Sequence, residues 1–181
     1  MSNYLIPLMV VVPMLCAILV NAFAKFNKSI KVLTFVVAIC LPIIPLLSNY
    51  GLHFFGGYTP MLDNATGVIY HPAITYAFDM LQQIFIAAVG LITFLVAFIY
   101  LSKYKKASGQ YLFLLFMGTA SVTALMLTDD IFNMFVFFEI LALVQVGIVI
   151  ASPMDYSYEM ALKYMILGSY LQVLVILTFL I

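Results

Sequence analysis

Residues 110–152 read QYLFLLFMGTASVTALMLTDDIFNMFVFFEILALVQVGIVIAS, and this stretch decides the fold class. It contains two continuous apolar runs, 110–128 and 130–152, which meet at the acidic pair Asp129 and Asp130. A helix needs about 20 predominantly apolar residues to cross a hydrocarbon core of roughly 30 Å. A membrane β-barrel would instead show alternating polar and apolar residues, and the stretch lacks that pattern. It therefore predicts two transmembrane helices joined by a very tight connection.

The rest of the chain repeats this pattern. Similar apolar runs predict further helices over 4–24, 32–48, 76–101 and 156–181. Of the 181 residues, 66% are hydrophobic and 8% are charged, whereas a typical soluble domain has about 25% charged residues. The net charge is zero and arginine is absent, which excludes the basic face that nucleic-acid binding requires. We expect an all-α, polytopic transmembrane bundle of about six helices, without a catalytic site of its own.

The connections differ in charge, and this difference predicts the orientation. Two of them contain most of the lysines, which are Lys25, Lys28 and Lys31 in the first and Lys103, Lys105 and Lys106 in the second. Segment 49–75 contains no lysine, and the connection at 129–130 is acidic. Because short cytoplasmic loops collect lysine, we expect the lysine connections inside and the N-terminus and segment 49–75 outside. The first run has no basic residue before it and no small-residue cleavage pattern after it, so we expect a retained helix.

Segment 49–75 is rich in glycine, proline, asparagine and tyrosine. This composition predicts an ordered excursion outside the membrane, of which a short hairpin is one form. His53 and His71 lie in it, 18 residues apart and without a third ligand type nearby, so we expect surface histidines and no metal site. Cys16 and Cys40 lie inside apolar runs and are predicted to be buried small hydrophobic residues.

Glu139 is the strongest candidate for a functional residue. It lies nine residues after Asp130, which places it roughly 13 Å from the outer interface and near the middle of the membrane. Desolvation penalises the charged form of a carboxyl at this depth, so Glu139 is poised to accept and release a proton. The alternative is a permanently neutral side chain that donates one hydrogen bond. Asn133 and Gln145 each lie six residues away, so polar partners must come from other helices.

Lys163 is the second candidate, roughly 10 Å inside the membrane if its helix starts near Tyr156. In one interpretation it forms an ion pair with Glu159, four residues earlier, in the order favoured on a helix. In the other it passes protons to Glu139 or tunes its charge, and a bridging water or polar side chain would then be needed.

Acidic residues in the first turn of a predicted helix are expected to be mainly structural. Asp79 opens the third helix and would stabilise its dipole. Asp129 and Asp130 are similar residues of the fifth helix, with Thr128 as the expected N-cap.

Three stretches carry a family resemblance: the Phe78-Asp79 helix opening, the run Thr128 to Ile140 ending in Phe-Phe-Glu-Ile, and Ala161-Leu162-Lys163-Tyr164 followed by Gly168-Ser169. With them the sequence resembles the proton-translocating, antiporter-like membrane subunits. These subunits are shared by respiratory NADH dehydrogenase, multisubunit sodium/proton antiporters and membrane-bound energy-converting hydrogenases. The resemblance covers essentially the whole chain.

The resemblance implies a proton-handling role for Glu139, which matches the fifth-helix glutamate of the family, and Lys163 matches the lysine of the sixth-helix motif. Asp79 and Glu159 would be supporting residues. The family has further helices in inverted repeats, so residues 110–181 would begin the first repeat after an N-terminal part, 1–109. The central lysines of the family's later helices have no counterpart here. The sixth run also remains apolar to Ile181, so a short or split member, or part of a longer chain, is implied.

The resemblance further implies a membrane-arm subunit of a complex that translocates H⁺ or Na⁺ in the cytoplasmic membrane of a prokaryote. It would be coupled to a redox enzyme such as a hydrogenase or NADH dehydrogenase, with no cofactor of its own and with membrane and redox subunits as partners. One alternative is a subunit of a sodium/proton antiporter without redox partners. Another is a non-conducting structural subunit, for which bulky replacements at Ala161 or Gly168 should disrupt assembly because small residues let helices pack closely.

Overall fold

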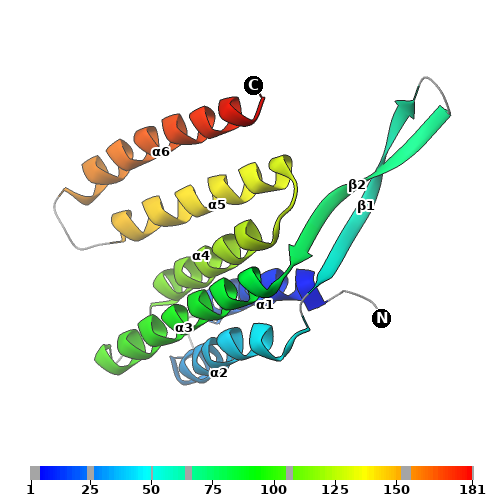
Figure 1. Cartoon of the computed structure of the whole chain (residues 1–181). Coiled ribbons are helices and arrows are strands. Elements are labelled where there is room, and N and C mark those ends of the chain that lie inside the picture. The colour runs from blue at the N-terminus through cyan, green and yellow to red at the C-terminus, as the bar shows by residue number, and fades with distance from the viewer. Residues whose placement is uncertain are drawn as a thin grey trace.

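The computed structural model describes residues 5–23, 27–49, 51–63, 67–104, 108–151 and 156–180. Over these residues the chain forms six helices and one β-hairpin (Figure 1). The elements are, in chain order, α1 (Leu5–Ala22), α2 (Asn27–Leu47), β1 (Leu52–Asp63), β2 (Gly67–Phe78), α3 (Met80–Lys103), α4 (Gly109–Leu127), α5 (Ile131–Ile150) and α6 (Ser157–Leu180). The predicted helical bundle is confirmed, with the hairpin as an addition at one end.

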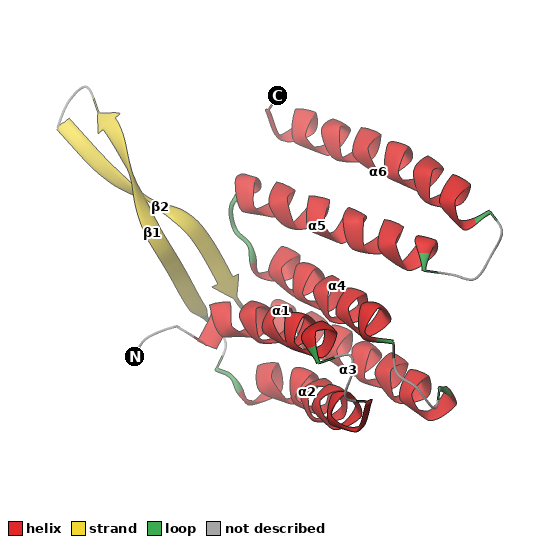
Figure 2. Cartoon of the chain, turned by 180° about the vertical axis from the view of Figure 1, so that it is seen from behind, coloured by secondary structure: helices red, strands yellow, loops and turns green. Residues whose placement is uncertain are grey.

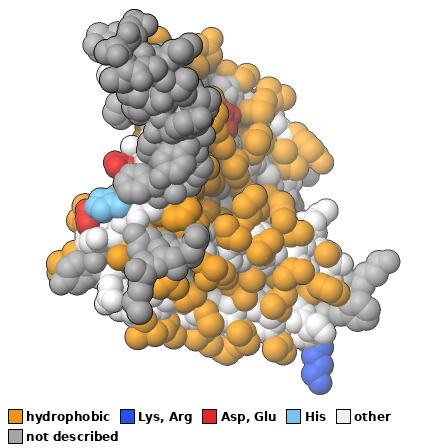
Figure 3. Space-filling view, turned by 90° about the vertical axis from the view of Figure 1, so that its right-hand side faces the viewer, with side chains coloured by type: hydrophobic (Ala, Val, Ile, Leu, Met, Phe, Trp, Pro, Cys, Tyr) orange, Lys and Arg blue, Asp and Glu red, His pale blue; other side chains and the backbone are white. Residues whose placement is uncertain are grey.

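The lipid-facing surface is apolar, as the composition requires. Within the described residues, α1 to α5 are long and apolar enough to cross a membrane. Their outer faces expose large hydrophobic side chains such as Leu15, Val36 and Ile92, and hydrophobic side chains are spread over the visible face of the bundle in Figure 3. The chain is therefore a multi-pass membrane protein. Cys16 is buried as predicted, but the prediction is wrong for Cys40, which α2 exposes on its outer side.

The hairpin replaces the first turn of the predicted third helix. Strands β1 and β2 pair antiparallel from Leu52 opposite Phe78 to Asp63 opposite Gly67. Residues 76–78 are held in this ladder, so α3 starts at Met80 and not at residue 76. At the base of the hairpin, Gly51 has a φ of +75°, which favours glycine, and its N–H donates to the Phe78 carbonyl at 2.7 Å.

The register of the hairpin also separates the two histidines. His53 lies opposite Ala77, whereas His71 lies opposite Thr59. They are thus six ladder positions apart, a backbone distance of roughly 20 Å at about 3.3 Å per residue. The two histidines are too far apart to bind one metal ion together.

The hairpin is anchored on the helices at its base (Figure 2). The Asp129 N–H donates to the Thr75 carbonyl at 3.0 Å, and Tyr76 forms a β-bridge with Thr128. Phe78 is completely buried. It belongs to an apolar cluster with Ile6, Met9, Val10, Tyr76, Ile86, Ala124 and Leu127. The start of α1, the hairpin and the α4–α5 connection therefore lie at the same end of the bundle, which we call the hairpin end.

The two lysine-rich connections lie together at the opposite end, which we call the lysine end. Lys31, near the start of α2, donates through Nζ to the carbonyl of Tyr104, just after α3, at 3.1 Å. Lys28 lies one turn earlier on α2, and Lys103 lies in the last turn of α3. Lys25, Lys105 and Lys106 fall outside the described residues. The segregation of charge agrees with the predicted orientation, and the assignment of the lysine end to the cytoplasm stays a prediction.

The helices pack in a definite order. Helix α4 contacts α1, α3 and α5, helix α2 contacts α3 and α1, and α6 contacts α5. In Figure 1, α6 lies at the outer edge of the bundle, next to α5. Ala161 of α6 is 2% exposed, whereas most other described side chains of this helix are exposed. Helix α6 is thus supported from one side only.

Helices α2 and α3 approach each other closely at Gly90. A Cβ atom on Gly90 would lie 2.7 Å from the Pro42 backbone nitrogen and 2.8 Å from the Leu41 carbonyl carbon. Backbone atoms cannot swing aside, so only glycine fits this contact. At Gly168 of α6, by contrast, a Cβ would meet nothing within 4 Å. Within this chain, therefore, Gly168 is not a close-packing position.

Gly90→Ala is expected to destabilise the protein, because the new methyl group forces α2 and α3 apart. Overpacking of this kind costs about 1–3 kcal/mol. Thermal unfolding of the purified protein in mild detergent measures the effect as a lower midpoint. Gly168→Ala is the matched control, and its midpoint should be unchanged or slightly raised, since alanine favours helix over glycine. Equal midpoints for the two variants would contradict the close approach.

Candidate functional site

Glu139 lies in the middle of a membrane-spanning helix. It follows the first residue of α5, Ile131, by eight positions, which places it about 12 Å along the helix axis. Its side chain is half-buried. From the described residues, no hydrogen bond or ion pair reaches its carboxyl group. Glu139 is thus near the middle of α5, without a fixed polar partner from the described residues, and its depth in the membrane stays a prediction.

Two hydrogen bonds show the register between α5 and α6, that is, which residues of the two helices are level with each other. The Tyr164 hydroxyl donates to Gln145 Oε1 at 2.7 Å, and Gln172 Nε2 donates to the Phe138 carbonyl at 3.1 Å. Because the helices are antiparallel, Glu139 is level with about residue 171 of α6.

Lys163 does not lie at the depth of Glu139. By the same register it is level with about residue 146 of α5. The two positions thus differ by roughly seven residues along the axis, or about 10 Å at 1.5 Å per residue. This offset excludes direct contact between the two side chains.

Lys163 is instead paired within its own helix. Its Nζ donates to Glu159 Oε1 at 2.6 Å, and the two side chains are 68% and 63% exposed. The arrangement is the self-neutralising pair that the sequence offered as one interpretation. It lies in the first two turns of α6, at the lysine end. An exposed pair of this kind adds little stability.

The other acidic residues cap helices at the hairpin end. Asp79 is exposed, directly precedes α3, and its N–H donates to Gln82 Oε1 at 3.2 Å. Asp130 caps α5, since its Oδ1 accepts from the Asn133 N–H at 2.8 Å. The structure thus gives Asp130 the expected structural role, and the role of the Asp79 carboxylate stays a prediction. The prediction that Thr128 caps α5 is wrong, because Thr128 still follows the last turn of α4 as its C-cap.

A layer of hydroxyl groups lies at the depth of Glu139 in the neighbouring helices. A Cβ atom built on Gly118 of α4 would lie 3.2 Å from the Val144 side chain of α5, so these two residues are level with each other. Because α4 and α5 are antiparallel, Glu139, five residues before Val144, is level with about Thr123, five residues after Gly118. One turn away, Thr119 shares a hydrogen bond of 2.9 Å with Thr93 of α3 in the core.

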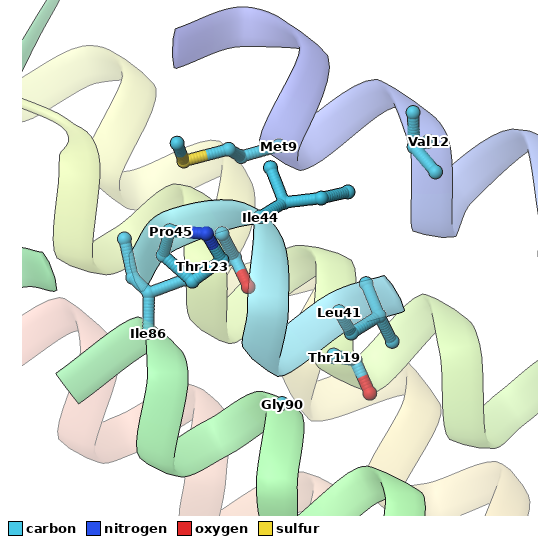
Figure 4. A pocket seen from close by; sticks show the side chains of 9 residues that line it. All are labelled: Met9, Val12, Leu41, Ile44, Pro45, Ile86, Gly90, Thr119 and Thr123. Atoms are coloured by element: carbon cyan, nitrogen blue, oxygen red, sulfur yellow. The ribbon is translucent and has the colours of Figure 1, made fainter. Parts of the chain in front are cut away.

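Thr119 and Thr123 also line a small cavity between α1, α2, α3 and α4 (Figure 4). Its volume is about 10 Å³, roughly what a single water molecule needs. Near it, Gln83 Nε2 donates to the carbonyls of Pro45 and Ser48 at 2.9 and 3.1 Å, which satisfies backbone groups at the end of α2. The mid-membrane polar groups of α3 and α4 thus belong to the core.

Polar atoms also meet where the hairpin base touches α5. Asp130 Oδ2 and Asn133 Nδ2 are buried, with no hydrogen-bond partner among the described residues. Burial raises the pKa of the neighbouring Tyr76 phenol. The Asn133 side chain lowers this pKa by a smaller amount, and the charge of the Asp130 carboxylate raises it further. Tyr76 therefore remains a neutral hydroxyl at this junction. In Figure 3, acidic side chains and a histidine lie beside one another at the hairpin end.

Comparison with known proteins finds sequence relatives of the whole chain, while no family model matches it. The chain is 37% identical over 175 residues to an uncharacterized protein of Methanocaldococcus jannaschii, and the alignment covers 97% of this chain and 35% of that protein. It is 22% identical over 174 residues to a Na(+)/H(+) antiporter subunit of Alkalihalophilus pseudofirmus, covering 96% of this chain and 35% of the antiporter protein. The second match supports the resemblance to antiporter-like membrane subunits.

A solved structure has the same fold. A chain of the membrane-bound sulfane sulfur reductase, an archaeal respiratory membrane complex, superposes with a TM-score of 0.69 at 21% identity. The superposition covers 93% of this chain and 34% of that one. The chain therefore spans about a third of the length of each of these proteins.

The polar groups that join α5 to α6 were not predicted from the sequence. The sequence placed Gln145 only relative to Glu139, and it gave no partner for Tyr164 or Gln172. A signal was present, because amides inside apolar runs usually face a partner helix. What the sequence lacked was the register that pairs position 145 with 164 and position 138 with 172.

Tyr164→Phe removes the hydroxyl that binds Gln145, so we expect α6 to hold less firmly on α5. Interhelical hydrogen bonds in membranes are worth about 0.6 kcal/mol on average, and a loss of that order should speed amide hydrogen exchange in α6 in the purified protein. Tyr170→Phe is the matched control, since Tyr170 is 69% exposed and makes no hydrogen bond to the described residues. If both variants exchange alike, the bond does not hold α6.

Proposed function

We propose that the chain belongs to a membrane subunit of a cation-translocating complex, in which Glu139 takes up and releases a proton. The observation that carries this proposal is the position of Glu139, an ionisable group near the middle of α5. Such groups are costly in the membrane and mark ion pathways in other proteins. The similarity to a Na(+)/H(+) antiporter subunit points in the same direction.

The surroundings of Glu139 supply no fixed counter-charge. Among the described residues, no cation lies in contact with it, and Lys163 is about 10 Å away along the helix axis. A cation that approaches from a neighbouring subunit would favour the charged form, and its withdrawal would favour proton uptake. Movement of charge outside this chain would thus be converted into movement of a proton at Glu139.

We assign supporting roles to the other candidates. Lys163 and Glu159 form a pair that is neutral while intact. If the pair opens, the free ammonium would act on Glu139 at a distance, through Gln145 and Tyr164, whose hydrogen bond lies between them. Asp79 contributes to the start of α3. Residues 110–181 would begin the first antiporter-like repeat.

We further propose a redox-driven complex, with the electron chemistry in partner subunits and no cofactor in this chain. The shared fold with a chain of a respiratory sulfur reductase supports this choice. The hydrogenase and NADH dehydrogenase branches of the same family are equivalent settings for the chain. The transported ion is H⁺, or Na⁺ exchanged for H⁺.

Glu139→Gln should abolish coupled ion movement, because the amide keeps the shape of the side chain but cannot carry a proton. The variant is introduced in the native host, and ion uptake by inverted membrane vesicles is measured together with the amount of assembled complex. Assembly should be unchanged. Asp79→Asn serves as the control and should retain most of the ion uptake, because Asp79 is exposed at the start of α3 and asparagine caps helices as well as aspartate does. Wild-type uptake by the Glu139→Gln complex would refute the role of Glu139.

The alternative is a sodium/proton antiporter without redox subunits, which the similarity to the Alkalihalophilus pseudofirmus protein favours. Purification from the native membrane in mild detergent separates the two. For the redox-driven complex we expect iron–sulfur absorbance and co-purifying redox subunits, identified by mass spectrometry. Membrane subunits alone, without such absorbance, would support the antiporter. A chain that purifies alone would contradict both versions of a multisubunit complex.

A further inference from the structure

A groove opens on the side of the bundle at the lysine end, away from Glu139. Helix α4 contacts both α3 and α5, and these two outer helices are not in close contact with each other over the described residues. The start of α4 therefore forms the floor, and the ends of α3 and α5 form the walls. The groove has a volume of about 690 Å³. Its lining residues are Val96, Ile99, Tyr100, Lys103, Tyr104, Ser108, Gln110, Tyr111, Ile148 and Ala151.

The polarity of the groove changes along its length. Val96 and Ile99 of α3 and Ile148 of α5 line the part nearer the middle of the membrane. Lys103, Ser108 and Gln110 line the part at the end of the bundle, where headgroups begin. An apolar part that leads to a cationic and hydrogen-bonding mouth has the polarity of a phospholipid.

Three tyrosines give the mouth a fixed shape. The rings of Tyr100 and Tyr111 stack with centroids 4.3 Å apart, and Tyr104 lies 5.0 Å from Tyr100. The Tyr100 hydroxyl accepts from the Ser108 N–H at 2.9 Å, which ties the end of α3 to the start of α4. Tyrosine is enriched at the level where acyl chains meet headgroups. The cluster thus marks the interface at this end.

Among the described residues, the charge at the mouth is positive and no carboxylate lines it. Lys103 Nζ lies 5.7 Å from the centre of the Tyr104 ring, and Lys31 binds the Tyr104 carbonyl from the other side. The residues lining the groove include no carboxylate, and among the described residues neither lysine forms an ion pair. Over the described residues, the mouth therefore presents a cation without an anionic partner.

We propose that this groove is a binding site for an anionic phospholipid. The phosphate lies against Lys103, with Ser108 and Gln110 as hydrogen-bonding groups, and an acyl chain follows Val96, Ile99 and Ile148. The proposal is independent of the role of Glu139. Positive residues beside the membrane attract anionic lipids by about 1 kcal/mol each, so the site would select its lipid mainly by charge.

The test uses the absence of tryptophan from this chain. Ile99→Trp places a fluorescent reporter in the groove, at a side chain that is 63% exposed and four residues before the end of α3. Ile84→Trp is the matched reporter, 55% exposed and four residues after the start of the same helix, at the hairpin end. Each protein is reconstituted with phosphatidylglycerol or phosphatidylcholine brominated at the same acyl positions. The signal of the unsubstituted protein is subtracted.

We expect the groove reporter to prefer brominated phosphatidylglycerol by roughly five-fold, the factor that one lysine supplies near an anionic surface, and the hairpin-end reporter to show no preference. Lys103→Gln should remove the preference, whereas Lys103→Arg and Lys28→Gln should keep it. Millimolar inorganic phosphate should not compete, because the site also needs the acyl chain. Equal quenching by both lipids, or a preference that survives Lys103→Gln, overturns the proposal. A groove reporter shielded from both lipids in the intact complex also overturns it, since a partner protein then occupies the groove.

Discussion

The hydrocarbon core of the membrane provides no hydrogen-bonding solvent, so every polar group at that depth must find a partner within the protein or remain neutral. The six helices satisfy their own backbone groups. Where α2 ends, Gln83 of α3 reaches across to the carbonyls of Pro45 and Ser48. Thr93 and Thr119 satisfy each other in the core. Among the described residues, Thr34 Oγ1 and Gln172 Oε1 are buried without such a partner, and no hydrogen bond or ion pair reaches the Glu139 carboxyl group.

The Glu139 carboxyl lacks a fixed partner among the described residues, although its helix is held firmly in place. Helix α5 is bound to α6 by two amide-mediated hydrogen bonds, one on each side of the depth of Glu139. The helix that carries the carboxyl is therefore held in register while the carboxyl itself has no fixed partner among the described residues. Helix α6 in turn has only α5 behind it and exposes most of its length. The exposed side of α6 is therefore available for contact with a further membrane subunit.

The two ends of the bundle are specialised differently. At the hairpin end, the Thr75 carbonyl and Phe78 anchor the strands on the α4–α5 connection and on the start of α1. Polar atoms of Asp130 and Asn133 are buried at that junction, at the start of the helix that carries Glu139. At the lysine end, tyrosine rings and Lys103 line an open groove between α3, α4 and α5. One end thus supports the start of α5, and the other carries the groove.

The sequence by itself determined the class of protein, the six helices, the segregation of lysine and the position of Glu139 near the middle of α5, because each of these depends on the local run of apolar and charged residues. Tertiary structure decided the rest. The ladder of the hairpin held residues 76–78 and delayed the start of α3, and Asp130 replaced Thr128 as the cap of α5. The close helix approach lies at Gly90 and not at Gly168. Lys163 lies too far along its helix to reach Glu139. These features depend on the register between segments, and register is set by packing and hydrogen bonds between side chains that are distant in the sequence.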